Sequence, residues 1–302
     1  MVRAVFPGGW YYPSNNMTLP SAFTKLEDSY RDCENIARGS NFYNGFRLLP
    51  RRKRQALSAV YAFMRQCDDI SDDEGSAPDK QEEFVRCRKL FDQVIRGNCY
   101  QHSTLPALYD TVRTFQIPAE YFIKLIDGTE MDLTAASYRS FEDLYRYCYH
   151  VASTVGLICI HIFGFHDSRA QECAEACGIA FQLTNILRDV KEDLKRHRIY
   201  LPLEDFQRFN YTESELRLEL MDERFRDLMR FEAQRARTFY LKARPLVGML
   251  ERDSRPAFWA MFESYQCLLK NIERRNYDVL SHRVQLTLQN KFQILLWALT
   301  KW

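Results

Sequence analysis

The stretch QLTNILRDVKEDLKRHRIYLP, residues 182–202, decides the fold that the sequence predicts. Its apolar side chains recur at the spacing of an amphipathic helix, and the apolar run CGIAF leads into it. Asn185, Asp189 and Asp193 stand at successive four-residue steps, so their side chains share one face of that helix. Like charges at this spacing destabilise a helix by about 0.2–0.5 kcal/mol per pair. The pattern therefore indicates that something outside the helix needs these oxygens.

The rest of the 302 residues also follows a helical pattern. Only 11 glycines and 10 prolines interrupt it, and no segment alternates polar and apolar residues as a strand does. A hydrophobic content of 46% is ample for a deep core, and no repeat or low-complexity linker divides the chain. We therefore expect an all-α fold with one helical domain, residues 21–302, behind a ragged N-terminal leader at residues 1–20. Pro245 predicts either a kink in one helix or its end near Arg244. The expected helices are 22–38, 51–68, 79–96, 104–116, 119–131, 138–163, 168–195, 213–219, 222–250, 256–281 and 285–300.

The sequence carries no pattern typical of a secreted or membrane-spanning protein. Its first 20 residues contain no uninterrupted apolar stretch, so they do not resemble a secretory signal. The longest apolar run, Val155 to Phe165, falls short of the roughly 18 residues that a membrane span needs and predicts a buried helix. The nine cysteines include no Cys-x-x-Cys pair, as is typical of reduced thiols. We expect a cytoplasmic protein, and its formal charge of +2 gives no reason to expect a nucleic-acid partner.

A second acidic face is predicted in the helix RQALSAVYAFMRQCDDISDDEG. Tyr61, Arg65, Asp68 and Asp72 follow one another at steps of four, three and four residues, so they project from much the same side. The residues before the aspartates are mostly apolar, which predicts a largely buried helix, and acids at a helix C-terminus oppose the macrodipole. A bound cation would compensate both unfavourable features.

The ligand types favour magnesium. Asp and Asn oxygens without a Cys or His cluster are typical of Mg²⁺ rather than zinc, and Mg²⁺ keeps positions open for water and substrate phosphate. A di-iron centre is the alternative, but it requires Glu-x-x-His pairs, and none of the six histidines has a Glu three residues before it. Arginines stand beside both acidic faces, and guanidinium groups match phosphate oxygens. The sequence therefore predicts a site for Mg²⁺ and a diphosphate.

Three segments together resemble a known family: SAVYAFMRQCDDISDD, YCYHVASTVG and QLTNILRDVKEDLKRHRIYLP. In order and spacing they are similar to the signature segments of the squalene and phytoene synthases, which join two isoprenyl diphosphates head to head. The likeness extends from about Cys33 to the C-terminus. It implies an isoprenoid-synthase-type helical bundle around a central cavity.

The resemblance also implies roles for individual residues. The metal ligands would be Asp68, Asp72, Asn185, Asp189 and Asp193, with several Mg²⁺ ions per site. The catalytic residues would be Tyr61, Arg65, Asp68, Asp72, Tyr149, Asp189 and Asp193. The substrate-binding residues would be Phe42, Gln182, Asn185, Arg188, Arg198, Tyr200 and Tyr265. Phe181 is a further candidate for the aromatic wall, although an ordinary core position is the favoured interpretation.

Within the family the sequence looks most like the bacterial presqualene diphosphate synthases of squalene and hopanoid pathways. We therefore expect two farnesyl diphosphates as substrates, with NADPH not needed for this first half-reaction. The alternatives are a phytoene or dehydrosqualene synthase of carotenoid biosynthesis and a full squalene synthase that uses NADPH. Isoprenyl diphosphates are the expected partners, together with downstream squalene-pathway enzymes.

A non-catalytic interpretation competes with the enzyme. The two acidic faces of a helical scaffold could bind basic partners, and the run RRKR at residues 51–54 could contact anionic lipid headgroups. Contact with a membrane surface is also compatible with catalysis, because substrates and products of this kind are lipids. We therefore add peripheral contact at the inner face of the cell membrane to the expectations.

Overall fold

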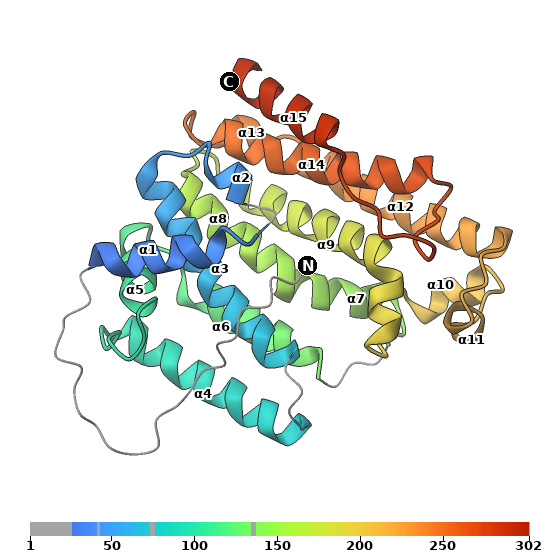
Figure 1. The fold of residues 1–302 in the computed structure, drawn as a ribbon, viewed down its shortest axis with the longest axis horizontal. Coiled ribbons are helices and arrows are strands. Elements are labelled where there is room, and N and C mark those ends of the chain that lie inside the picture. Colours follow the sequence, from blue (N-terminus) through green and yellow to red (C-terminus); the bar gives the residue numbers. More distant parts are fainter. Residues whose placement is uncertain (1–25, 41–42, 73–75, 134–136, 302) are drawn as a thin grey trace.

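Helix α9 (Ala170–Lys195) contains the stretch with Asn185, Asp189 and Asp193, and other helices pack around it (Figure 1). The computed structural model describes residues 26–40, 43–72, 76–133 and 137–301, so the predicted leader at residues 1–20 lies outside the described part. Within that part the only β contacts are two isolated bridges, so the predicted all-α fold is confirmed. The other helices are α1 (Leu26–Ala37), α2 (Tyr43–Phe46), α3 (Arg51–Asp72), α4 (Ala77–Ile95), α5 (Leu105–Thr114), α6 (Ala119–Met131), α7 (Phe141–Cys148), the π-helix η1 (Tyr149–Ser153), α8 (Thr154–Phe163), α10 (Leu203–Arg208), α11 (Glu213–Arg217), α12 (Glu223–Ala243), α13 (Leu246–Met249), α14 (Arg255–Arg274) and α15 (Leu288–Lys301).

Three of the predicted helices differ from the observed ones. The segment 138–163 forms α7, η1 and α8 rather than one helix. Pro245 follows the end of α12, so the 222–250 segment is divided there. Helix α14 stops at Arg274 because Asn276 and Tyr277 adopt the left-handed conformation, with φ of 50° and 61°. The short helices α2 and α10 were not predicted, since a helix of four to six residues offers too little periodicity to read.

One buried apolar cluster runs from Ala37 to Val284, so the helices before α15 share a core, as the single-domain prediction requires, and α15 packs onto α14 through a small separate cluster that includes Trp259 and Ala298. Phe63 of α3, Phe91 of α4 and Phe122 of α6 meet inside it, with ring centroids 5.0–5.7 Å apart. These contacts hold α3 against α4 and α6. In the described part of the chain, no helix combines the length and the apolar character needed to cross a membrane.

Helix α8 packs against both α3 and α9, which carry the two acidic motifs. Helices α3 and α9 run in the same general direction in Figure 1, so their C-terminal ends lie toward one side of the molecule. Lys53 fixes the opposite end of α3: its Nζ donates to the carbonyl of Phe163 at 2.9 Å and contacts Glu251 at 2.7 Å and Asp253 at 2.6 Å. A contact of 3.3 Å between Arg198, just after α9, and Ser71, at the end of α3, shows that these two ends lie close together.

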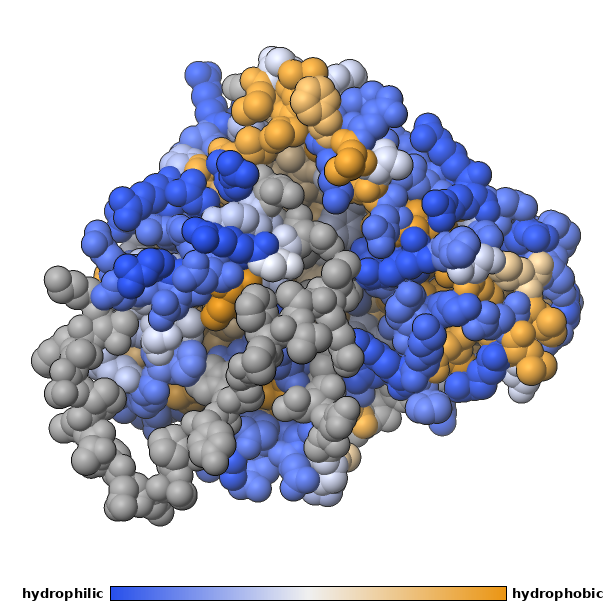
Figure 2. All heavy atoms as spheres, in the orientation of Figure 1, coloured by the Kyte–Doolittle hydropathy of each residue, from blue (hydrophilic) through white to orange (hydrophobic). Residues whose placement is uncertain are grey.

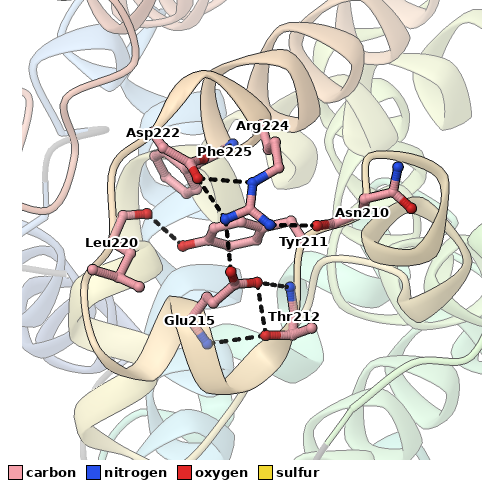
Figure 3. Close-up of polar contacts among 8 residues, drawn as sticks. All are labelled: Asn210, Tyr211, Thr212, Glu215, Leu220, Asp222, Arg224 and Phe225. Carbon is pink, nitrogen blue, oxygen red and sulfur yellow. Dashed lines mark hydrogen bonds and ion pairs between the residues drawn. The ribbon is translucent and has the colours of Figure 1, made fainter.

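The connection from α10 to α12 is held by Arg224 (Figure 3). Its guanidinium donates to the carbonyl of Asn210 at 2.7 Å and to the carboxylates of Glu215 at 2.6 Å and Asp222 at 2.5 Å. Thr212 caps α11, because its hydroxyl accepts from the backbone N–H of Glu215 while the Glu215 carboxylate accepts from the backbone of Thr212. This network fixes the chain where it returns to pack α12 along α9.

Candidate active site

The acidic face of α9 is partly neutralised by two arginines. The Nε of Arg188 donates to Asp189 Oδ1 at 2.7 Å, and a second contact joins its Nη2 to Oδ2. The Nε of Arg283, from the segment after α14, reaches the same Oδ1 at 2.8 Å. Burial would raise the pKa of Asp189, but the hydrogen bonds from the two arginines outweigh it and lower the pKa. Asp189 is therefore ionised at neutral pH.

The neighbouring carboxyl, Asp193, behaves in the opposite way. Burial raises its pKa to about 7, and the negative charge of Asp189 adds to that shift, while Arg196 and Arg198 oppose it. Two acids one helical turn apart thus have pKa values displaced in opposite directions. Neighbouring acids whose pKa values are shifted in opposite directions are typical of a functional site, because burial and the charge of one acid together alter the pKa of the other.

Arg198 connects the ends of α3 and α9. Its Nη2 donates to Ser71 Oγ at 3.3 Å, and its Nη1 lies 3.6 Å from Asp132 Oδ2. The hydroxyl of Tyr200 donates to Asp132 Oδ1 at 2.9 Å, and that of Tyr147 donates to Oδ2 at 3.2 Å. Arg198 and Tyr200, both predicted to bind substrate, therefore share the carboxylate of Asp132, which follows the end of α6.

The aromatic side of the site is built by α9 and α14. Tyr265 stacks on Phe181 with ring centroids 4.1 Å apart and an interplanar angle of 6°. Burial raises the pKa of Tyr265, although the charge of Arg188 and a hydrogen bond with the Asn185 side chain oppose the shift. Phe181, predicted as a core residue, packs against the core but stays half-buried. Phe181 therefore supports Tyr265 next to the polar residues of α9.

Tyr149 begins η1, a π-helical turn of the kind that often occurs at functional sites. The Nζ of Lys124 lies 3.4 Å from the Tyr149 hydroxyl and 5.3 Å from the centre of its ring. Gly178 of α9 permits η1 to pack closely against α9, because a Cβ at position 178 would lie 2.5 Å from the backbone of Ser153. Helix α9 and η1 thus approach each other more closely than a side chain would permit.

The motif on α3 is only partly described. Arg65 pairs with Asp69 at 2.7 Å, and Asp68 is half-buried. Burial raises the pKa of Tyr61, and the charge of Arg65 opposes that shift. Asp72 ends α3, but its side chain lies outside the described part of the structure, as does all of Phe42.

Several of these side chains lie deep in the fold and are still reached by solvent. Tyr61, Tyr149, Gln182 and Tyr265 are half-buried. At the end of α9 a cavity of about 10 Å³, room for one water molecule, is lined by residues that include Asp193 and Arg198. The site is thus an interior surface rather than an exposed helix face.

The oxygens of α9 fit a hard cation. Asn185 Oδ1 is buried and accepts no hydrogen bond from the described part of the chain, and the pKa of Asp193 is raised by burial and, to a smaller extent, by the negative charge of Asp189. A cation would relieve both. The described residues do not contain a preformed cluster of three or more His, Cys, Asp or Glu ligands. The predicted metal ligands therefore stay a prediction, supported by the unpaired oxygen and the charge imbalance.

Four residues of the site were missed in the sequence. Arg283 and Asp132 lie outside the predicted motifs, each as a single charged residue, and Lys124 lies on an ordinary amphipathic helix. Tyr147 stands in the motif YCYH two residues before Tyr149, so it was visible, but only the packing shows that it contacts Asp132. For the first three no local signal exists, because their partners are far away in the chain.

Comparison with known proteins gives a consistent assignment. Residues 37–290 match the squalene/phytoene synthase family. A phytoene synthase of Arthrospira platensis is 38% identical over 283 residues, covering 89% of this chain and 91% of the relative. A 15-cis-phytoene synthase of Synechocystis sp. is 36% identical over 284 residues, covering 89% and 84%.

Two solved structures share the fold. A dehydrosqualene synthase in complex with a ligand has a TM-score of 0.84 at 27% identity and covers 92% of this chain and 98% of its own. A squalene synthase from Alicyclobacillus acidocaldarius has a TM-score of 0.79 at 26% identity and covers 85% and 97%. The chain therefore belongs to the squalene/phytoene synthase family of head-to-head prenyltransferases.

Proposed function

We propose that the protein is a phytoene synthase, which joins two geranylgeranyl diphosphates head to head in a Mg²⁺-dependent reaction. The observation that carries this proposal is the 36–38% identity, over about nine tenths of the chain, with relatives named phytoene synthases. The sequence alone favoured a presqualene diphosphate synthase and gave a phytoene synthase as the alternative. The names of the relatives favour the phytoene synthase.

In the proposed reaction, C1 of the donor loses diphosphate and the double bond of the acceptor attacks the resulting cation. A proton then leaves, which closes a cyclopropane, and loss of the second diphosphate with rearrangement and another proton loss gives the C40 hydrocarbon. No hydride is needed, because the final cation is quenched by proton loss. Released diphosphate is the proposed base, with Tyr61 and Tyr149 as alternative relays.

The residues of the site support this chemistry. Arg188 and Arg283 contact Asp189, and Arg198 contacts Asp132, so all three would supply positive charge to a diphosphate bound beside these carboxylates, in a half-buried site that strengthens such interactions. Mg²⁺ held by Asp68, Asp72, Asn185, Asp189 and Asp193 would add Lewis-acid stabilisation of the same leaving group. The rings of Tyr265 and Tyr149 can stabilise a cation by about 0.5–2 kcal/mol each and keep water away from it.

A product assay tests the proposal. The protein is given farnesyl and geranylgeranyl diphosphates together, with Mg²⁺, with and without NADPH, and the hydrocarbons and diphosphate are measured. We expect C40 phytoene irrespective of NADPH. A C30 product is the second candidate, favoured by the dehydrosqualene and squalene synthase structures, and it would contradict the phytoene assignment. No diphosphate release would instead support a non-catalytic scaffold.

The metal sites are tested by Asp68→Asn and Asp189→Asn. Each change should lower kcat by about 100-fold or more, as expected when charge stabilisation at a leaving group is removed. Asp92→Asn is the matched control, because Asp92 lies on the surface of α4 and pairs with Arg96. Full activity in either site variant would rule out the proposed ligand set.

A further inference from the structure

Helix α15 presents two different faces. Its inner face is narrow: Ala298 is fully buried, Ile294 packs beside it, and Trp297 stacks on Trp259 of α14 with ring centroids 6.3 Å apart. Asn290, one turn before Ile294, accepts a hydrogen bond from Asn271 at 3.4 Å. These contacts attach α15 to α14 and leave most of its surface uncovered.

The opposite face is a continuous apolar stripe. It is formed by side chains spaced so that they project from one side of the helix, away from Ile294 and Ala298. We call it the outer stripe; its members and their exposed fractions are Leu288 (84%), Phe292 (67%), Leu295 (42%), Leu296 (48%) and Leu299 (63%). Figure 2 shows it as the hydrophobic surface over α15, bordered by hydrophilic side chains. Exposed apolar side chains are common singly, but a contiguous stripe of this kind marks an interaction site.

Basic residues lie near the outer stripe. Helix α15 contains no acidic residue; Lys291 stands at the edge of the stripe, whereas Lys301 lies on the inner side, with its Nζ 5.6 Å from the centre of the Trp259 ring. Leu48 belongs to the cluster that packs against Ala298, so the segment around the start of α3 lies near α15; it carries the exposed Arg47 and, at the first turn of α3, the exposed Arg51 and Arg52. In the run RRKR at residues 51–54, Lys53 and Arg54 are engaged with acidic side chains of the protein, whereas Arg51 and Arg52 point to solvent.

We propose that this surface docks onto an anionic lipid bilayer, with the outer stripe in the acyl boundary and the basic side chains at the headgroups. An amphipathic helix with leucines and a phenylalanine on one face and basic side chains near it is typical of interfacial binding. Each Lys or Arg near an anionic surface adds further attraction. The argument rests on α15 and its neighbours alone and does not depend on the proposed product.

A second copy of the chain fits the same surface less well. In a pair of α15 helices packed through their outer stripes, Lys291 at the edge of each stripe would lie at the interface. Because α15 offers no acidic side chain, this charge would stay uncompensated by the partner helix.

Vesicle sedimentation of the full-length protein tests the docking surface. In 0.15 M NaCl the wild type should sediment with vesicles of equal phosphatidylglycerol and phosphatidylcholine, and at least about tenfold less with phosphatidylcholine alone. Leu295→Gln/Leu299→Gln should lower partitioning to the anionic vesicles by about tenfold or more. Arg51→Gln/Arg52→Gln should also lower it by about tenfold, and less so in 0.5 M NaCl.

Matched control variants distinguish binding through this surface from non-specific binding to vesicles. Leu241→Gln changes a leucine of α12 that is 67% exposed, and Arg86→Gln/Lys89→Gln removes two exposed positive charges from α4. Both should bind vesicles like the wild type and, like the α15 variant, should keep the wild-type melting temperature. The proposal is overturned if the wild type does not bind, or if the site variants bind no worse than the controls. It is also overturned if sedimentation equilibrium shows a dimer that Leu295→Gln/Leu299→Gln dissociates while vesicle binding is unchanged.

Discussion

The carboxylate of Asp189 accepts hydrogen bonds from Arg188, its neighbour in the chain, and from Arg283, 94 residues away. A half-buried carboxylate with two guanidinium partners is fixed in position, and its pKa stays low. Arg283 is thus a positioning residue for Asp189 as well as a positive charge beside the proposed diphosphate.

Replacing Arg283 with Gln should lower kcat by about tenfold or more, because Asp189 loses one partner and the leaving group loses one positive charge. Steady-state kinetics with geranylgeranyl diphosphate would measure it. His282→Gln is the control, since His282 is exposed and adjacent in the chain. If both variants kept wild-type kinetics, the contact with Asp189 would have no functional role.

Glu232 is a second unusual acid, outside the site. It is 1% exposed and, together with the buried Asp205, contacts the single guanidinium of Arg235, at 2.6 and 2.7 Å. Burial raises the pKa of Glu232 to about 8, against the charge of Arg235, and Asp205 adds to the shift. Two carboxyls sharing one cation therefore retain a proton at neutral pH.

The stability of the protein should depend on pH through the proton that Glu232 retains in the folded state. In the unfolded chain Glu232 has its ordinary pKa of about 4.3. Its contribution to stability is therefore complete below that value and is lost as the pH rises to about 8, at a cost on the order of 1–3 kcal/mol. Glu232→Gln should remove this part of the slope, so wild type and variant should diverge in thermal unfolding measured from pH 5 to 9. Parallel curves over that range would contradict the shared proton.

The π-helix η1 depends on close packing with α9. A Cβ at Gly178 would lie 2.5 Å from the Cα and backbone nitrogen of Ser153, and these backbone atoms cannot rotate away. Because η1 begins with Tyr149, the position of that tyrosine depends on Gly178.

Gly178→Ala should therefore destabilise the protein by about 1–3 kcal/mol, although alanine is the better helix former. It should also lower kcat, because Tyr149 is displaced. Thermal unfolding and steady-state kinetics measure the two effects. In the control Gly248→Ala a Cβ meets nothing within 4 Å, so stability should be equal or slightly higher. An alanine at position 178 that leaves both quantities unchanged would contradict the packing argument.

The long helices could be predicted from the sequence, and the features between them could not. In α3, α9 and α12 the apolar residues repeat over at least five turns, which leaves little ambiguity. The change from α7 to η1 leaves no periodic signal in the sequence, and the close approach of Ser153 to Gly178 is visible only in the folded structure. Likewise, the end of α14 requires left-handed φ values at Asn276 and Tyr277, where the sequence contains no glycine.

The site shows the same division for the molecule as a whole. Asn185, Arg188, Asp189 and Asp193 share one helix, so their common face follows from spacing alone. The links from Asp189 to Arg283 and from Arg198 to Ser71 span 94 and 127 residues, and only the packing of the complete chain creates them. Local patterns thus predict which residues are candidates for the chemistry, while the residues that hold these candidates in place emerge from the fold.

The folded protein should contain free thiols and no disulfide bonds. All nine cysteines lie in the described part of the chain and are free, and Cys67 and Cys87 approach only to an Sγ–Sγ distance of 3.8 Å. Burial raises the pKa of most of these thiols, including Cys148 and Cys177, which slows their reaction. A thiol reagent should therefore label the native protein slowly and count nine thiols after unfolding, and a reductant should not change the melting temperature. Fewer than nine thiols in the unfolded, unreduced protein would contradict this.

The two guanidinium groups that contact Asp189 affect how ligands would bind to the empty site. If Asp189 binds Mg²⁺ as proposed, a free divalent ion would have to displace an arginine to reach that carboxylate, and a free phosphate would have to draw an arginine away from it. A cation and an anion that arrive as one complex would instead exchange partners and leave every charge compensated. The proposed site would then bind free metal or inorganic phosphate weakly and favour the metal-loaded substrate.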